Sequence, residues 1–229
     1  MATVLLVRHG RSTANTGGVL AGHTPGVLLD EVGQQQADAL VGRLAGLELA
    51  AAISSPLERC METAQRALAG REAGIRVDER IVECRYGDWT GKELKSLTDD
   101  PMWKVVQRHP SAAVFPGAEG ESLRDVQNRA VEAIREFNAE FGDRAVYAVF
   151  SHGDVIKAIL ADALGLHLDQ FQRIVVNPCS VSVVTYTPER PFVHRMNDTS
   201  GDFASFAPPA QSDESTSDAV VGGGTGDGR

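Results

Sequence analysis

The chain has 229 residues, long enough for one sizeable α/β domain, and 42% of its residues are hydrophobic while 23% are charged. Its formal net charge of -9 excludes an extended basic surface of the kind that binds nucleic acid, so no nucleic-acid partner is expected. No apolar run reaches the roughly 18 residues that cross a bilayer, so no membrane partner is expected either.

The first predicted element is a short buried strand over residues 4–7, which runs directly into Arg8, His9 and Gly10. In open α/β sheets the ligand binds beyond the carboxyl ends of the strands, so these residues lie where chemistry is expected. Arg8 offers a charged planar fork suited to phosphate or carboxylate, and His9 offers a ring nitrogen that is neutral near pH 7. On this tripeptide alone, the polar end of an edge strand is an equally good interpretation.

A long loop is predicted over residues 11–29, which are rich in Gly, Thr, Asn and Pro. Asn15 in this loop is a candidate hydrogen-bond donor to a ligand, and the alternative is that it closes a turn. Asp30 then has the character of a helix N-cap, and apolar residues at helical spacing predict a helix over residues 31–45. A short apolar strand is expected over residues 49–53.

A second polar motif follows that strand at residues 54–59. Ser55 with Glu58 three residues later predicts a capping box, and Pro56 stands in the favoured first helical position. Arg59 is then expected near the first turn of the helix, where free backbone N–H groups already favour anions. The alternative is that Arg59 is a solvated helix charge, the usual fate of arginine.

A strand predicted over residues 75–82 leads into Glu83, which opens a polar loop punctuated by glycine and aromatic residues. Residues 92–118 are then interpreted as a small irregular helical excursion that forms a flap over the strand ends. The flap carries basic side chains for which a solvated surface is favoured over substrate contact: Lys95, Lys104, Arg108 and His109.

A capping pattern at Ser122 starts a long predicted helix. The next buried strand, residues 145–150, ends in a serine followed by His152 and Gly153, and another helix follows. Two separate buried strands therefore each deliver a histidine followed by a glycine. The last strands are expected within residues 174–186, with an Asn-Pro turn between them.

The composition shifts to Ser, Asp, Gly, Pro and Ala toward the end of the chain. Residues 1–200 are therefore expected to form one domain, and residues 201–229 an acidic Gly/Ser-rich disordered tail. The three cysteines, Cys60, Cys84 and Cys179, lack the spacing of a zinc site or a disulfide framework. Together with an N-terminus that lacks the basic region of a signal peptide, they favour a cytoplasmic protein.

Four separated motifs together resemble the histidine phosphatase superfamily, also called phosphoglycerate-mutase-like, over roughly residues 1–195: Arg8-His9-Gly10, Arg59 at a helix start, Glu83 in a loop, and Ser151-His152-Gly153. Residues 54–59 and 116–123 are similar to those of its phosphatase members. The resemblance implies an α/β fold, a three-layer sandwich with a mostly parallel central sheet and helices on both faces. A homodimer is a further expectation.

The resemblance also implies a covalent mechanism. His9 would attack phosphorus and become a phosphohistidine, which divides one hard step into two easier ones. Arg8 and Arg59 would hold the phosphoryl oxygens through charge-assisted hydrogen bonds.

The remaining site residues follow from the same resemblance. His152 would complete the phosphate pocket together with Gly153 and stabilise the transferring group. Glu83 would protonate the leaving oxygen and then activate water. Asn15 matches a family position that contacts phosphate or substrate.

No cofactor and no metal are expected, because arginines and histidines neutralise the phosphoryl oxygens and no HExxH, Cys/His cluster or Asp-rich loop is present. The expected function is a metal-independent phosphatase acting on a small phosphorylated metabolite, and the alternative is a phosphomutase that uses the same phosphohistidine. The phosphatase is preferred because the flap lacks the adjacent arginine pair of the family's mutases: Lys104 and Arg108 are separated. A catalytically weak binding protein is disfavoured because all the reactive groups are present.

Overall fold

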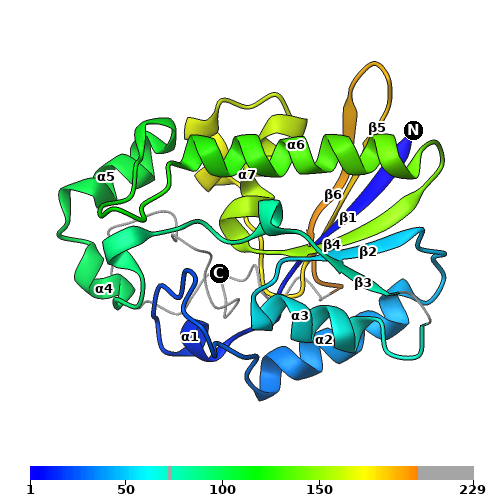
Figure 1. Ribbon diagram of the computed structural model, residues 1–229, viewed down its shortest axis with the longest axis horizontal. Helices are drawn as coiled ribbons and strands as arrows, with labels where there is room; N and C mark the ends of the chain where they lie inside the picture. The colour runs from blue at the N-terminus through cyan, green and yellow to red at the C-terminus, as the bar shows by residue number, and fades with distance from the viewer. Residues whose placement is uncertain (72–73, 201–229) are drawn as a thin grey trace, which may run out of the picture.

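The computed structural model of the chain describes residues 1–71 and 74–200 (Figure 1). In this part of the chain one six-stranded sheet has the strand order β3-β2-β4-β1-β5-β6. The strands are β1 (Ala2–Arg8), β2 (Ala51–Ser54), β3 (Ile75–Val77), β4 (Val146–Ser151), β5 (Val181–Tyr186) and β6 (Pro191–Asp198). The disordered tail predicted over residues 201–229 lies outside the described residues.

Helices cover both faces of the sheet, with α6 and α7 on one side and α2 and α3 on the other (Figure 1). The α-helices of the described residues are α1 (Thr13–Thr16), α2 (Glu31–Leu44), α3 (Glu58–Ala67), α4 (Leu94–Leu97), α5 (Pro101–Arg108), α6 (Leu123–Phe141) and α7 (Gly153–Ala163). Short 3₁₀ helices are η1 (Glu79–Ile81), η2 (Gly87–Trp89), η3 (Pro110–Ala112) and η4 (Leu168–Arg173). The predicted three-layer α/β sandwich is confirmed.

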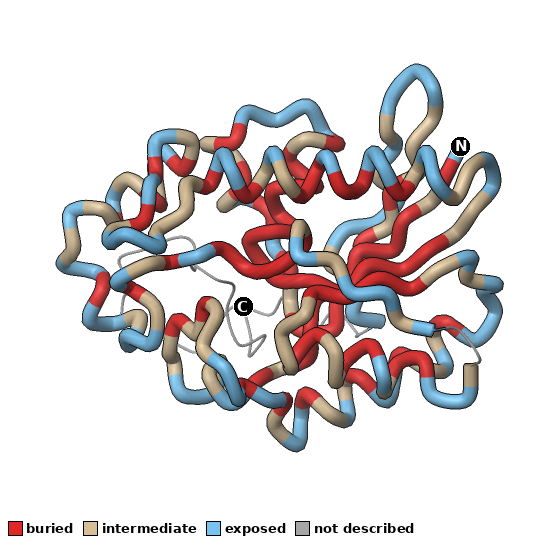
Figure 2. Tube along the Cα trace, in the orientation of Figure 1, coloured by how far each residue is buried: buried red, intermediate tan, exposed pale blue. Residues whose placement is uncertain are grey.

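The central strands are buried on both faces, as their continuous apolar runs predict (Figure 2). Along β1, Val4 and Leu6 belong to the core shared with α6 and α7. Leu5 and Val7, which alternate with them, belong to the core shared with α2 and α3. β1, β2, β3 and β4 pair in parallel, while β5 is antiparallel to β1 and β6 is antiparallel to β5, so the sheet is mostly parallel.

The pairing of the strands decides which residues meet at the carboxyl edge of the sheet. β1 and β4 are parallel neighbours with Arg8 opposite Ser151, so His9 and His152 leave the sheet one residue later at adjacent positions. β2 lies on the other side of β4 with Ser54 opposite Phe150, which brings Ser55 to the same edge. Three segments far apart in the sequence therefore end side by side.

Two predicted strands are wrong in part. The strand expected over residues 75–82 ends at Val77, because the Asp78 carboxylate accepts the Arg80 N–H and starts the 3₁₀ helix η1. Residues 174–176 form no strand, and the Val176 carbonyl accepts a hydrogen bond from the Arg8 side chain instead of from a neighbouring strand. The edge strand β6 was not expected at all.

Residues 92–118 contain α4, α5 and η3, as an irregular helical excursion predicts. This segment packs on Trp89, whose Nε1 donates to Asp100 at 3.0 Å and whose ring lies 6.1 Å from that of Trp103. The four basic side chains noted in the sequence are exposed. That this segment moves as a flap stays a prediction.

Gly10 is expected to tolerate no side chain, because a Cβ there would lie 2.6 Å from the carbonyl oxygen of Gly33 at the start of α2. Gly10→Ala is predicted to lower the free energy of unfolding by about 1–3 kcal/mol, the usual cost of overpacking. Gly42→Ala is the matched control, since no atom lies within 4 Å of its Cβ, and it should stabilise α2 by roughly 0.5–1 kcal/mol. Urea titration of both variants measures the difference, and equal midpoints would contradict the close approach.

Candidate active site

His9 leaves the end of β1 and is 3% exposed. Its Nδ1 lies 2.7 Å from the Gly10 carbonyl oxygen, which can only accept, so Nδ1 carries the ring proton and Nε2 keeps its lone pair. Burial, together with the charges of Arg59 and Arg8, holds the pKa of His9 well below its ordinary value. His9 is therefore a neutral imidazole with a nucleophilic Nε2 at neutral pH.

Arg8 and Arg59 place two guanidinium groups beside this imidazole, and both side chains are buried. Arg8 Nη1 donates to the Val176 carbonyl at 2.8 Å. Arg59 Nη2 donates to the Gly22 carbonyl at 2.9 Å, while its Nη1 has no hydrogen-bond partner among the described residues. A buried cationic N–H without an acceptor is uncommon in folded proteins, and it is the group that an anion would satisfy.

The predicted capping box at Ser55 is wrong. α3 begins at Glu58 after Leu57, and no side chain caps it, although Arg59 does lie in its first turn as expected. The Ser55 hydroxyl instead lies 2.7 Å from Nε2 of His152, because the pairing of β2 with β4 brings the two residues together. Pro56 consequently precedes the helix.

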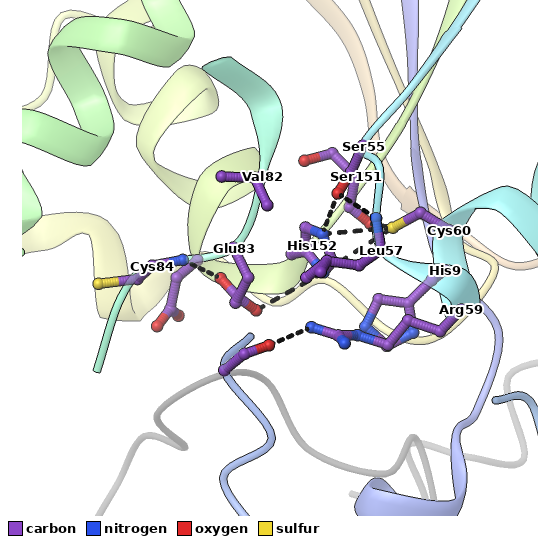
Figure 3. A network of polar contacts seen from close by, with 12 residues as sticks. His9, Ser55, Leu57, Arg59, Cys60, Val82, Glu83, Cys84, Ser151 and His152 are labelled. Carbon is purple, nitrogen blue, oxygen red and sulfur yellow. Dashed lines mark hydrogen bonds and ion pairs between the residues drawn. The ribbon is translucent and has the colours of Figure 1, made fainter. Parts of the chain in front are cut away.

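His152 directly precedes α7 and has no exposed surface. Its ring centroid lies 5.3 Å from that of His9, with the two rings inclined at 60° (Figure 3). Burial, followed by the charge of Arg59, holds the pKa of His152 well below its ordinary value. Gly153 opens α7, so its backbone N–H belongs to the turn whose donors lack intrahelical acceptors.

Glu83 lies 3% exposed on the far side of His152, with Oε2 3.8 Å from the Nδ1 of that ring (Figure 3). Its Oε1 accepts the Cys84 N–H at 2.9 Å. Burial, reinforced by the negative charge of Asp154, raises the pKa of Glu83 to about 7. A carboxyl group with such a pKa can both give and take a proton near neutral pH.

The loop that carries Glu83 is fixed by two residues that sequence reasoning did not select. His23 Nε2 donates to the Glu83 carbonyl at 2.7 Å, and Arg129 Nη2 donates to the same oxygen at 3.2 Å. Arg129 is itself held by a bidentate pair with Glu121, at 2.6 Å and 3.0 Å. Arg129 has the spacing of an ordinary polar helix residue in α6, so its local sequence carries no signal of this role.

The contacts of the Asn15 side chain are with the turn at the start of α1. Its Oδ1 accepts hydrogen bonds from the backbone N–H and the hydroxyl of Ser12, at 3.0 Å and 2.9 Å, and so closes the start of α1. This contact corresponds to the turn interpretation. A role for Asn15 in phosphate binding stays a prediction.

The positive charge of this site comes from Arg8 and Arg59. In residues 1–71 and 74–200 no three His, Cys, Asp or Glu side chains are grouped so that they could hold a metal ion. Over the same residues no helix combines the length and apolar character needed to cross a membrane.

Comparison with known proteins identifies relatives of this chain. A family model described as the histidine phosphatase superfamily (branch 1) matches residues 4–199. The chain is 31% identical over 177 residues to glucosyl-3-phosphoglycerate phosphatase of Mycolicibacterium vanbaalenii, covering 73% of this chain and 76% of the relative. It is 24% identical over 184 residues to a 2,3-bisphosphoglycerate-dependent phosphoglycerate mutase of Thermoplasma acidophilum, covering 80% and 87%. The structure of Bacillus stearothermophilus YhfR matches with a TM-score of 0.80 at 29% identity, covering 86% and 98%.

Proposed function

Because the chain belongs to the histidine phosphatase superfamily, we propose that it is a phosphoric monoester hydrolase that acts through a phosphohistidine on His9. The observation that carries this proposal is the pair of neutral imidazoles 5.3 Å apart, with two buried guanidinium groups beside them. A tetrahedral phosphoryl group needs a nucleophile, charge neutralisation and a proton donor, and His9, the arginines and Glu83 supply them.

In the first half-reaction the lone pair of His9 Nε2 forms the P–N bond while the bond between phosphorus and the ester oxygen breaks. Arg8 and Arg59 hold the equatorial oxygens, where charge accumulates in the transition state. Protonated Glu83 gives its proton to the departing oxygen, so the product leaves as a neutral alcohol and Glu83 becomes a carboxylate.

In the second half-reaction a water molecule attacks the phosphohistidine. The Glu83 carboxylate takes a proton from that water as the new P–O bond forms, and the P–N bond electrons return to His9 Nε2. Inorganic phosphate then leaves, with His9 neutral and Glu83 protonated again. Both steps use the same groups, so no additional residue has to enter the site between them.

The substrate is proposed to be a small phosphorylated metabolite, which is consistent with the relative named as a glucosyl-3-phosphoglycerate phosphatase. A phosphomutase is the second candidate, since another relative is named as a mutase. The phosphatase is favoured because Lys104 and Arg108 on α5 are separate and exposed, whereas a mutase must hold a bisphosphorylated intermediate while it turns round.

A metal-free screen of phosphorylated metabolites tests this choice, with release of inorganic phosphate as the readout. It includes 3-phosphoglycerate with and without a bisphosphoglycerate primer. Phosphate release from at least one ester, without primer-dependent isomerisation, is expected. Primer-dependent conversion of 3-phosphoglycerate to 2-phosphoglycerate that outruns phosphate release would contradict the phosphatase and support the mutase.

Metal chelators are predicted to leave kcat/KM unchanged, because Arg8 and Arg59 supply the positive charge that a metal ion supplies in other phosphatases. Activity is measured before and after incubation with EDTA and removal of the chelate by gel filtration. Loss of activity that Mg²⁺ or Zn²⁺ restores would contradict this prediction. Loss that no metal restores would indicate damage by the treatment, which a parallel incubation without EDTA detects.

The cytoplasm is proposed as the compartment. Cys60, Cys84 and Cys179 are free and buried, as reduced thiols are in a reducing environment. The expected homodimer stays a prediction.

A further inference from the structure

Ser55 is a buried hydroxyl of the site that the mechanism above does not use. It follows β2 directly, and its backbone N–H donates to the Phe150 carbonyl of β4 at 2.9 Å. This anchor holds its Oγ 2.7 Å from Nε2 of His152, and neither residue has exposed surface (Figure 3). The inference below rests on the proposed function, because it concerns how His152 serves the same reaction.

Two hydrogen-bond arrangements are compatible with this distance when His152 is neutral. In one, the Ser55 hydroxyl donates to Nε2, so the ring proton is on Nδ1. In the other, Nε2 carries the ring proton and donates it to Ser55 Oγ. The two arrangements differ in what Nδ1 presents to Glu83 Oε2 at 3.8 Å: an N–H in the first and a lone pair in the second.

The other contacts of Ser55 distinguish these arrangements. Its Oγ already accepts the Leu57 N–H at 3.4 Å. When the hydroxyl also donates to His152, the donor and the acceptor of Ser55 are both used. In the opposite arrangement the oxygen accepts twice, and the Ser55 proton is left with the Cys60 sulfur, a weak acceptor, as its neighbour among the described residues. Buried hydroxyl groups strongly favour complete pairing.

We propose that Ser55 is a positioning residue that donates its hydroxyl hydrogen bond to Nε2 of His152 and thereby fixes the ring proton of His152 on Nδ1. The two active-site imidazoles then hold the same tautomer, but Nε2 is free for attack in His9 and engaged by Ser55 in His152. His9 donates from Nδ1 to the Gly10 carbonyl and keeps a lone pair on Nε2. His152 accepts at Nε2 and presents an N–H on the side of Glu83.

These different hydrogen bonds at Nε2 give two chemically identical side chains different functions. A neutral N–H is attracted to phosphoryl oxygens and to the Glu83 carboxylate, whereas a ring lone pair in the same place would repel both. Without Ser55, the remaining neighbour of Nε2 is the Cys60 sulfur at 3.4 Å, a weak hydrogen-bond partner, so His152 would exchange between tautomers. Only one of these tautomers stabilises the transferring group. The Ser55 hydroxyl is therefore expected to affect kcat more than KM.

The tautomers themselves are measured by ¹⁵N–¹H correlation spectroscopy of the imidazole rings in the protein labelled with ¹⁵N-histidine. Assignment uses the variants His9→Ala and His152→Asn, each of which removes one set of ring signals. The expected spectrum shows a pyrrole-type Nδ1 and a pyridine-type Nε2 in both rings, with the His152 Nε2 shift moving in Ser55→Ala and the His9 shifts unchanged. A protonated Nε2 in His152 of the unaltered protein overturns the proposal.

Kinetics supply a second test with Ser54→Ala as the matched control, because Ser54 is an equally buried serine whose hydroxyl donates to the Ser55 carbonyl and not to His152. Ser55→Ala is expected to lower kcat by about 10–100-fold, less than the loss of a complete oxyanion donor, with a smaller change in KM. Ser54→Ala should remain close to the unaltered enzyme. Equal kcat values for the two variants would overturn the proposal.

The outcomes also separate this inference from the proposed function. If the unaltered protein releases phosphate from no ester, the proposed function fails, while the ring spectrum still decides the role of Ser55. If the enzyme is active and His152 carries its proton on Nε2, only the role of Ser55 is refuted.

Discussion

Replacing His9 by alanine is expected to lower kcat by at least about 10⁴-fold, the order of loss seen when the nucleophile of a covalent mechanism is removed. Within the arrangement of the site, His152 lacks the free Nε2 needed to replace it, since that nitrogen is engaged by Ser55 at 2.7 Å. Binding of inorganic phosphate should persist, because both arginines remain. Steady-state hydrolysis and phosphate titration by calorimetry measure the two effects separately.

His194→Ala is the matched control for this variant. His194 lies exposed on the edge strand β6, where its Nε2 is near the Thr185 hydroxyl, and it is expected to leave kcat unchanged. Circular dichroism of both variants reports whether the fold is retained. A His9→Ala protein that is folded and turns over at the rate of the control would remove His9 from the role of nucleophile.

Replacing Glu83 by glutamine is expected to lower kcat/KM by about 10²–10⁴-fold, the usual contribution of general acid–base catalysis. The amide is nearly isosteric with the carboxyl group and can still accept the Cys84 N–H, so the loop should keep its conformation. It cannot transfer a proton to the leaving oxygen. An ester with a leaving group that needs no protonation, such as a nitrophenyl phosphate, should lose less activity than an alkyl phosphate.

The pH dependence of kcat/KM shows whether Glu83 is the general acid. Its pKa is raised to about 7, so the protonated form that the first step requires is lost as the pH rises through that value. His9 has a pKa well below its ordinary value and is already neutral in this range. The kcat/KM of the unaltered enzyme should therefore fall about tenfold per pH unit on the alkaline side of pH 7, the slope for loss of a single proton. This fall should be absent in Glu83→Gln.

Glu119→Gln is the control, since Glu119 lies in the same region with its side chain 82% exposed, paired only loosely with Arg85 at 3.5 Å. It should reproduce the pH profile of the unaltered enzyme. Ionisation of the substrate, with a second pKa of about 6 for phosphate monoesters, is common to all three proteins and cancels in their ratios. An alkaline limb that survives in Glu83→Gln would show that another group is the acid.

The sequence was sufficient to predict the α/β class and to place both histidines at strand ends, whereas their meeting was expected only from the family resemblance. Apolar runs identify β1 and β4 as buried strands, and their carboxyl ends must share one edge of a parallel sheet. The order β2-β4-β1 could not be predicted in this way, because it depends on contacts between residues far apart in the sequence, such as Arg8 and Ser151. The family resemblance, which the family model confirms, supplied the rest.

The errors arise where tertiary contacts override local patterns. Ser55 has the spacing of a helix cap, yet a neighbouring strand offers its hydroxyl a better partner in His152. Residues 174–176 have the apolar composition of a strand, yet the Val176 carbonyl serves Arg8. β6 was not predicted because an exposed edge strand, PFVHRMND, needs few buried apolar residues and carries no periodic signal.

The sequence could not predict the roles of His23 and Arg129, because these roles also depend on tertiary contacts. Both act on the carbonyl oxygen of Glu83, a backbone atom that any residue would present. Side-chain patterns reveal which chemistry a residue can perform, but they do not reveal which backbone atoms it will hold. The support of the Glu83 loop became visible only from the folded arrangement.

Rapid-quench labelling tests the central claim, that His9 carries the phosphoryl group between the two half-reactions, most directly. The enzyme is mixed for milliseconds with a ³²P-labelled substrate, denatured in alkali to preserve phosphoramidates, and digested for mass spectrometry. Acid-labile label is expected on Nε2 of His9, formed and lost at rates compatible with turnover and absent from His9→Ala. Label on any other residue, or hydrolysis at full rate with no labelled enzyme and no burst of released alcohol, would contradict it.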